Sequence, residues 1–137
     1  RPGLDFSFSG LKTHTRNLWH EVGEPEESKA DIAAGFEQAV VDTLAIKCRR
    51  AMQQTRAGQL VVAGGVGANR ALRAKLKREG EKHGWRVAYP RPEFCTDNGA
   101  MIAYAGCLRL LAGEQTGPEI QAQARWSLDK LHPPGES

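Results

Sequence analysis

The sequence predicts an α/β protein in which a partly parallel sheet is flanked by helices. Two short apolar runs, at 59–63 and 85–89, contain β-branched and aromatic residues, and each is followed by a turn and a helical pattern. Strands that alternate with helices of this length are typical of βαβ units with right-handed crossovers. With 137 residues, 40% of them hydrophobic, the chain has the size of one domain or one lobe of a larger protein.

Two kinds of spacing predict the first elements of the chain. Residues 4–10 (LDFSFSG) alternate apolar and polar side chains, and this period of two predicts a half-buried strand that ends at Gly10. Residues 11–20 carry Leu11 and Leu18 on one side, which predicts a short helix. Residues 22–28 are polar and contain a proline, so we expect a loop there.

A long helix is the next predicted element. Ser28 and Asp31 resemble a capping box, which predicts a helix that starts at Ser28. Apolar side chains then recur at steps of three and four residues, and Ile32, Phe36 and Val40 lie on the expected core face. The helix is expected to end at Gly58, and strand 59–63, helix 68–79, strand 85–89, a proline-containing loop and helix 97–112 are expected after it.

Charge and cysteine content set broad limits on function. A net charge of +3 permits contact with an anion or a nucleic acid, but an ordinary solvated surface explains it more simply. The three cysteines form no CxxC pair, which favours a reducing compartment over a disulfide framework. With no apolar run of membrane-spanning length, we expect a cytoplasmic protein without a membrane partner. Because the first residue is Arg1 and not methionine, we also expect a missing upstream part.

The turn after the first βαβ strand has the features of a ligand site. Ligands of parallel α/β sheets bind beyond the carboxyl ends of the strands, where Gly64 and Gly65 lie. Glycines let a ligand approach the backbone, and the amides at the next helix start can hold an anion. Asn69 adds a donor and an acceptor, so the turn suits a phosphate or a ribose. A plain tight turn with Asn69 as helix cap is the structural alternative, since no GxGxxG or GxxxxGK[ST] motif is present.

A second polar turn precedes the helix expected at 97–112. Its Asp97 can serve as a carboxylate ligand for a divalent cation beside the phosphates. Alternatively, Thr96 and Asp97 are ordinary helix caps. One carboxylate does not make a metal site, and the four histidines show no spacing that places two on one helix face. If Asp97 binds a metal, most of the other ligands lie outside this chain.

Five segments, taken in order, resemble one family. They are LDFSFSGLKT, DIAAGFEQAVVDTL, LVVAGGVGANRALR, YPRPEFCTDNGAMIAYAG and the pair Arg125-Trp126. From about Leu4 to Leu128 the chain is similar to the carboxyl-terminal half of the TsaD family, also called YgjD or Gcp. The resemblance implies an actin-like ATPase fold (ASKHA, ribonuclease-H-like) with a nucleotide between two lobes. Residues 1–137 would then form the C-terminal lobe, and the N-terminal lobe would be absent from the chain.

The resemblance also implies an activity. The family transfers threonylcarbamoyl from threonylcarbamoyl-AMP to the N6 amine of the anticodon-loop adenosine of ANN-decoding tRNAs, in a metal-assisted reaction. The implied cofactors are an adenine nucleotide and one divalent metal, with iron or zinc ahead of magnesium. The implied partners are tRNA, a TsaB-like paralogue and a TsaE-like ATPase.

Four residues match functional positions of the family. The resemblance makes Asp97, in the CTDN motif, the carboxylate metal ligand and Asn69 an adenylate contact. It places Gly64 and Gly65 beside the nucleotide. The family's two histidine metal ligands form an HxxxH motif of the first lobe that is absent here, so we expect the fragment to be inactive alone. No residue is assigned as a catalytic base.

Two other functions remain as alternatives. One is a nucleotide-binding or assembly lobe without catalysis, although an intact Asp97 and Asn69 argue against it. The other is a metallo-glycoprotease, the family's former label, which no HExxH motif supports. Lys12 and Thr13 are expected on the surface, and Trp85 and Trp126 in the core. The basic residues Arg70, Arg73, Lys75, Lys77 and Arg78 can attract tRNA, but their spacing favours a solvated helix surface.

Overall fold

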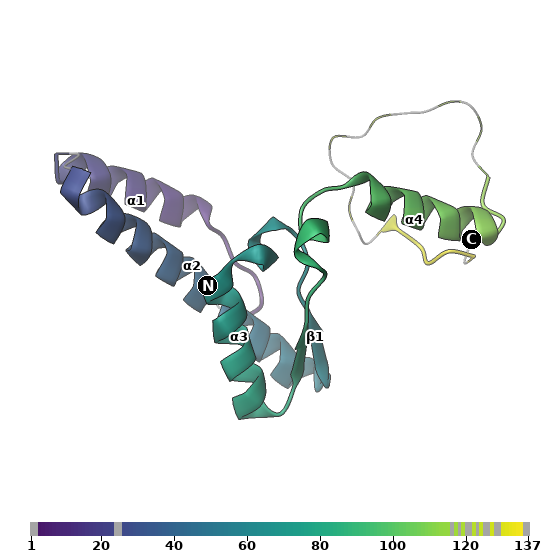
Figure 1. Cartoon of the computed structure of the whole chain (residues 1–137), viewed down its shortest axis with the longest axis horizontal. Coiled ribbons are helices and arrows are strands. Elements are labelled where there is room, and N and C mark those ends of the chain that lie inside the picture. The colour runs from purple at the N-terminus through teal and green to yellow at the C-terminus, as the bar shows by residue number, and fades with distance from the viewer. Residues whose placement is uncertain are drawn as a thin grey trace. The chain divides into compact units, whose positions relative to one another are not determined.

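The computed structural model of the chain describes residues 3–23, 26–115, 117, 119, 122, 124, 127 and 130–135. The chain divides into two compact units, Arg1–Cys95 and Thr96–Ser137. In the first unit (Figure 1) the elements are α1 (Ser9–Glu21), α2 (Glu26–Thr55), β1 (Gln59–Val61), the 3₁₀ turn η1 (Gly65–Ala68), α3 (Arg70–His83), β2 (Arg86–Ala88) and η2 (Pro92–Phe94). In the second unit, α4 spans Gly99–Leu111.

The two strands form a parallel sheet, as the sequence predicts. β1 pairs with β2, with Leu60 opposite Val87, and α3 is the crossover between them. The helices α2 and α3 pack against each other, while α2 also contacts β1 and α3 contacts β2. The first unit is therefore an α/β layer built around one β1–α3–β2 unit.

The core lies where α2, α3 and the start of β2 meet. Its buried members are Val41, Ala45, Met52, Leu72, Leu76 and Trp85. Leu76 has no exposed surface, and Trp85 is buried as predicted. Gly80 allows the indole to reach α3, because a Cβ there would lie 2.5 Å from the Trp85 carbonyl oxygen. Trp126, the other tryptophan predicted in the core, lies outside the described residues.

The expected core face of α2 is shifted along the helix. Ile32, Phe36 and Val40 are only half-buried, whereas Val41 and Ala45 are buried. The difference has a simple cause. Helix α1 packs against α2, and the apolar side chains near Phe36 lie beside α1, while α3 and the sheet enclose the later turns.

The strand predicted at residues 4–10 is wrong. Residues 4–8 have no regular structure, and α1 begins at Ser9, inside the predicted strand. A strand requires a neighbour for its backbone hydrogen bonds, and the described part of the chain has only β1 and β2 in its sheet. Just before this segment, the Gly3 carbonyl accepts a hydrogen bond from Lys47 Nζ at 2.7 Å.

The predicted helix boundaries also need correction. α2 begins at Glu26, so Ser28 lies within its first turn and is not the cap. Glu26 and Glu27 put negative charge at the positive end of the helix dipole, which favours the earlier start. α2 ends at Thr55, not at Gly58, and Arg56 follows with a positive φ of 53°. α3 runs four residues beyond its predicted end, to His83.

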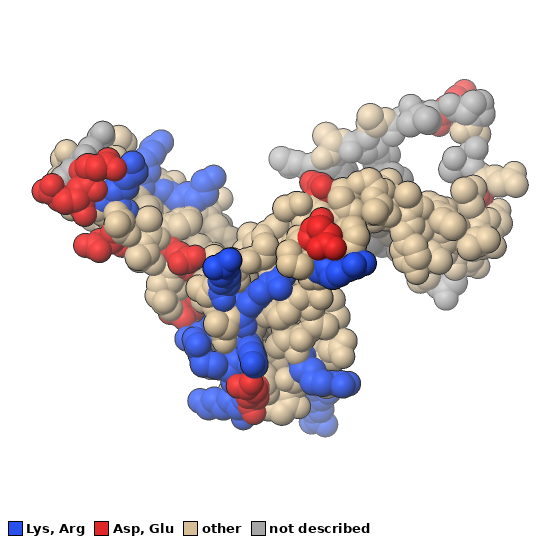
Figure 2. Space-filling model, viewed as in Figure 1, with Lys and Arg blue, Asp and Glu red and all other residues tan. Residues whose placement is uncertain are grey.

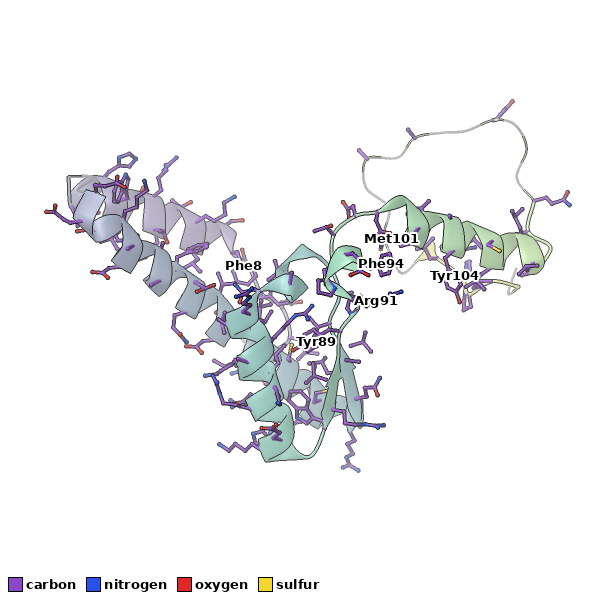
Figure 3. The ribbon with its side chains drawn as sticks, in the orientation of Figure 1. Phe8, Tyr89, Arg91, Phe94, Met101 and Tyr104 are labelled. Atoms are coloured by element: carbon purple, nitrogen blue, oxygen red, sulfur yellow. The ribbon has the colours of Figure 1, made fainter. Side chains whose placement is uncertain are left out.

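Helix α4 exposes much of its apolar surface. Met101 and Tyr104, labelled in Figure 3, are 50% and 67% exposed, and Leu111 is 80% exposed. Among the described residues, no helix is both long enough and apolar enough to cross a membrane.

Candidate functional site at the glycine turn

The turn between β1 and α3 needs a glycine at position 64. Gly64 has φ 86° and ψ 168°, a conformation that is essentially restricted to glycine. Nothing lies within 4 Å of the position its Cβ would take, so the backbone dihedral and not crowding explains this residue. Gly64 and Gly65 are both exposed, which leaves their backbone accessible to a ligand.

A third glycine in the same turn was not singled out from the sequence. Gly67 is buried, and a Cβ there would lie 3.4 Å from Cγ1 of Val62. Its carbonyl oxygen accepts a hydrogen bond from Nε of Arg73 at 2.6 Å. The signal available in the sequence is the repetition of glycine in GGVG, which indicates a turn that is tightly packed on one side.

Asn69 is the cap of α3, which confirms the structural alternative raised from the sequence. Its Oδ1 accepts from the Leu72 amide at 2.8 Å. Its Nδ2 donates to Oε1 of Glu37 on α2, at 2.7 Å. Both ends of the side chain are therefore engaged, although the second hydrogen of Nδ2 can still be donated to a ligand. The adenylate role of Asn69 stays a prediction.

Asp97 is in the second unit, two residues before α4. The cap of α4 is Asn98, whose Oδ1 accepts from the Met101 amide at 3.0 Å, so the expectation that Thr96 or Asp97 caps the helix is wrong. The Asp97 side chain is exposed and has no hydrogen-bond or ion-pair partner among the described residues. Its carboxylate is available to an external cation.

The described residues do not form a metal centre by themselves. No three His, Cys, Asp or Glu side chains of the described chain lie close enough together to hold an ion. Asp97 fits one ligand position but not a complete site, since metal ions in proteins require several ligands.

The sequence comparison with known families gives a direct assignment. Residues 2–104 match the TsaD family, described as tRNA N6-adenosine threonylcarbamoyltransferase. This chain belongs to the TsaD family. The match covers well over half of the chain and contains the glycine turn, Asn69 and Asp97. The pair Arg125-Trp126, to which the resemblance also extends, lies outside both the TsaD match and the described residues.

An apolar hollow adjoins the TsaD glycine turn. It has a volume of about 250 Å³ and lies between α2 and the start of α3. Val66 from the turn and Leu72 from α3 contribute to its apolar wall, and Asn69 and Glu37 supply its polar groups. This hollow has the composition of a small ligand site, apolar with few polar groups.

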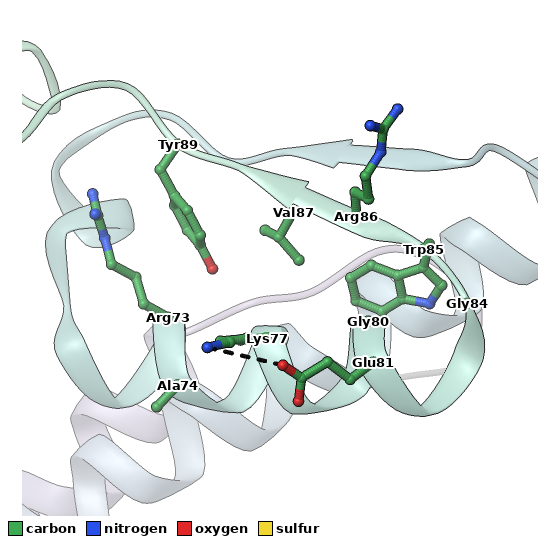
Figure 4. Close-up of a pocket in the computed structure, with 10 residues that line it drawn as sticks. All are labelled: Arg73, Ala74, Lys77, Gly80, Glu81, Gly84, Trp85, Arg86, Val87 and Tyr89. Atoms are coloured by element: carbon green, nitrogen blue, oxygen red, sulfur yellow. Dashed lines mark ion pairs between the residues drawn. The ribbon is translucent and has the colours of Figure 1, made fainter.

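A larger groove lies between α3 and β2, away from the candidate residues. Its volume is about 760 Å³, and Figure 4 shows Tyr89 and Arg73 at one end and Trp85 and Gly84 at the other. None of Gly64, Gly65 and Asn69 lines it. This groove is therefore not a candidate nucleotide site.

Arg73 contacts the glycine turn, a role that its sequence position did not reveal. Its Nη2 donates to Sγ of Cys95 at 3.2 Å, and its guanidinium lies 4.5 Å from the ring centroid of Tyr89. From the sequence it was predicted only as one member of a basic helix surface. Two of the other basic residues there pair with carboxylates, Lys75 with Asp42 and Lys77 with Glu81, as expected of a solvated surface, and Figure 2 shows mainly blue groups over α3 with a red group beside them.

Two groups of the first unit, Tyr89 and Cys48, have raised pKa values. Burial raises the pKa of Tyr89, the positive charge of Arg73 opposes this shift, and Cys48 adds to it. The Tyr89 hydroxyl is buried and has no partner in the described chain. Burial likewise raises the pKa of the Cys48 thiol. Both groups therefore stay uncharged near neutral pH.

Proposed function

We propose that this chain is part of a tRNA N6-threonylcarbamoyladenosine transferase. The observation that carries the proposal is the TsaD match over residues 2–104, which includes all four candidate residues. The reaction would move threonylcarbamoyl from threonylcarbamoyl-AMP to the anticodon-loop adenosine of ANN-decoding tRNAs. In this proposal the first unit is part of the second lobe of an actin-like ATPase fold.

The glycine turn would bind the adenylate. Gly64 and Gly65 present an open backbone, and the adjacent hollow of about 250 Å³ can receive a small, mostly apolar group. Asn69 would keep Oδ1 on the Leu72 amide and donate the second hydrogen of Nδ2 to the ligand. Such contacts act mainly by holding the reactive carbonyl in line with the attacking amine.

Asp97 would supply one carboxylate to a divalent cation, with iron or zinc ahead of magnesium. It is exposed and engaged by no other described residue, so binding breaks no internal contact. When bound, such a cation neutralises charge that develops on the acyl group and on the departing AMP. Because the described residues offer no complete ligand set, the other ligands would come from the first lobe.

The proposed function also implies partner proteins and a cellular location. A TsaB-like paralogue and a TsaE-like ATPase would assemble with the protein, and tRNA would be the acceptor. Because tRNA is the acceptor, we propose that the protein works in the cytoplasm.

The decisive experiment compares Asp97→Ala with wild type in the complete protein, including its first lobe. Transfer to tRNA is measured by nucleoside mass spectrometry, with partner proteins and precursors present. We expect the variant to lose transfer and bound metal while its melting temperature stays unchanged. Asp31→Ala is the matched control, because Asp31 is an exposed aspartate on α2, outside the candidate site.

Two results would contradict the proposal in different ways. Full transfer by Asp97→Ala with unchanged metal content would remove the metal role of Asp97. No transfer by a folded, nucleotide-binding wild type would favour a non-catalytic binding lobe.

A further inference from the structure

We propose that Arg73 is a positioning residue that ties the glycine turn to the segment leading into Asp97. The inference rests on the proposed function of the turn and adds a residue to it. Arg73 does not contact the ligand in this proposal. It acts through Gly67 on one side and through Cys95 on the other.

The first contact holds the glycine turn from behind. Nε of Arg73 donates to the Gly67 carbonyl at 2.6 Å, while the Arg73 amide donates to the Asn69 carbonyl at 3.1 Å. Gly67 itself is buried against Val62. The Arg73 side chain thus fixes the turn at its third glycine, whereas the bond of its amide is the ordinary backbone bond of helix α3. The exposed Gly64 and Gly65 lie between β1 and this fixed glycine.

The second contact holds the turn after β2. Nη2 of Arg73 donates to Sγ of Cys95, which is only 2% exposed. The Cys95 thiol also lies within hydrogen-bonding distance of the carbonyl oxygens of Pro90 and Arg91, to which it can donate, with Sγ–O distances of 3.8 and 3.6 Å. Figure 3 shows Arg91 beside Phe94 in this turn, with the guanidinium 5.1 Å from the ring centroid. Cys95 is the last residue of the first unit, two residues before Asp97, so Arg73 fixes the point at which that segment departs.

The partners of Arg73 differ from those of two neighbouring cations of α3. Lys75 and Lys77 pair with carboxylates, whereas Arg73 is held by a carbonyl, a thiol and the Tyr89 ring. A carboxylate on Arg73 would cancel its charge. Without one, a positive charge remains directly behind the turn that would receive an anionic adenylate, while the planar fork of the guanidinium sets the geometry.

The test uses two substitutions that separate charge from geometry. Arg73→Lys keeps the charge but loses the fork, and Arg73→Gln loses both. Arg78→Lys is the matched control, because Arg78 is exposed on the same helix and its side chain makes no hydrogen bond or ion pair with a described residue. Each is made in the complete protein, and AMP affinity is measured by calorimetry alongside kcat, KM and the melting temperature.

We expect Arg73→Lys to weaken AMP binding about tenfold and to lower kcat, because lost charge-assisted hydrogen bonds have effects of this size. Arg73→Gln should weaken binding further, and Arg78→Lys should match wild type. Cys95→Ala should lower kcat but keep AMP affinity, since Nε still holds Gly67. This last variant decides the question if the Arg73 variants do not fold.

The outcomes distinguish this inference from the proposed function. Wild-type AMP affinity and kcat in Arg73→Lys, or wild-type kcat in Cys95→Ala, would overturn the positioning role and leave the transferase function intact. A wild type that neither binds AMP nor transfers threonylcarbamoyl would overturn the function, and the inference with it.

Discussion

At the scale of single residues, Asn69 has two competing uses. Its Oδ1 caps α3, and its Nδ2 is bound to Glu37 and is the group that would meet an adenylate. Sequence reasoning raised both uses without deciding between them, because a cap and a ligand contact require the same residue at the same place. Geometry confirms the cap and shows that Nδ2 is already bound to Glu37, which leaves one amide hydrogen for a ligand.

Substitution at position 69 can separate the two uses. Serine caps helices about as well as asparagine but has no amide to donate, so Asn69→Ser should keep stability and lose nucleotide affinity. Asn69→Ala should lose both, with a fall in the unfolding free energy of about 1 kcal/mol. Urea unfolding and AMP titration measure the two effects. Unchanged AMP affinity in Asn69→Ser would show that Asn69 is a cap alone.

At the scale of elements, the packing of α3 against the start of β2 depends on the absence of a Cβ atom at Gly80. A Cβ on Gly80 would meet the Trp85 carbonyl at 2.5 Å and its ring at 3.2 Å. The sequence predicted α3, both strands and their parallel pairing, because local periodicity and turn residues determine these. It did not reveal Gly80 or Arg73, whose roles depend on residues brought close only by folding.

Gly80→Ala should therefore destabilise the protein although alanine is the better helix former. We expect a loss of about 2 kcal/mol, because the clash with backbone exceeds a propensity gain of about 1 kcal/mol. Gly35→Ala, on α2 with open space at its Cβ, is the control and should stabilise. The free energy of unfolding of both variants is measured by chemical denaturation. A Gly80→Ala variant as stable as wild type would contradict a rigid contact between Gly80 and Trp85.

The thiol of Cys48, on α2, should make the stability of the protein fall at alkaline pH. Because burial raises its pKa, the native state binds more protons than the unfolded state above the ordinary thiol pKa of about 8.5. Its contribution to stability is present below that pH and is lost as pH rises toward the raised value. The melting temperature of Cys48→Ala should fall less steeply with pH than that of wild type, whereas exposed Cys107→Ala should follow wild type. Parallel curves of melting temperature against pH for wild type, Cys48→Ala and Cys107→Ala would contradict this role of the Cys48 thiol.

At the scale of the whole molecule, the chain carries only part of the expected site. Among the described residues, no three metal-binding side chains lie together, and the glycine turn is open to solvent. The sequence could name these residues through the family resemblance, but it could not show a complete ligand set, since the other ligands are expected in another lobe.

The separate chain should therefore bind AMP weakly or not at all, and the complete protein should bind it clearly. Calorimetry at matched concentrations tests this, with circular dichroism as the check that the separate chain is folded. A tight isotherm for the separate chain would contradict a site shared between lobes.

The β1–α3–β2 unit also has a consequence for how the protein folds. Its strand pairs join residues 27 positions apart, such as Gln59 and Arg86, whereas α1 and α2 follow each other directly in the chain. Contacts of long sequence separation form with a larger loss of chain entropy than local ones. We expect the glycine turn, enclosed in this segment, to acquire protection in pulsed hydrogen exchange later than α1 and α2. The proposed adenylate-binding turn would then be shaped only once β1 and β2 have paired.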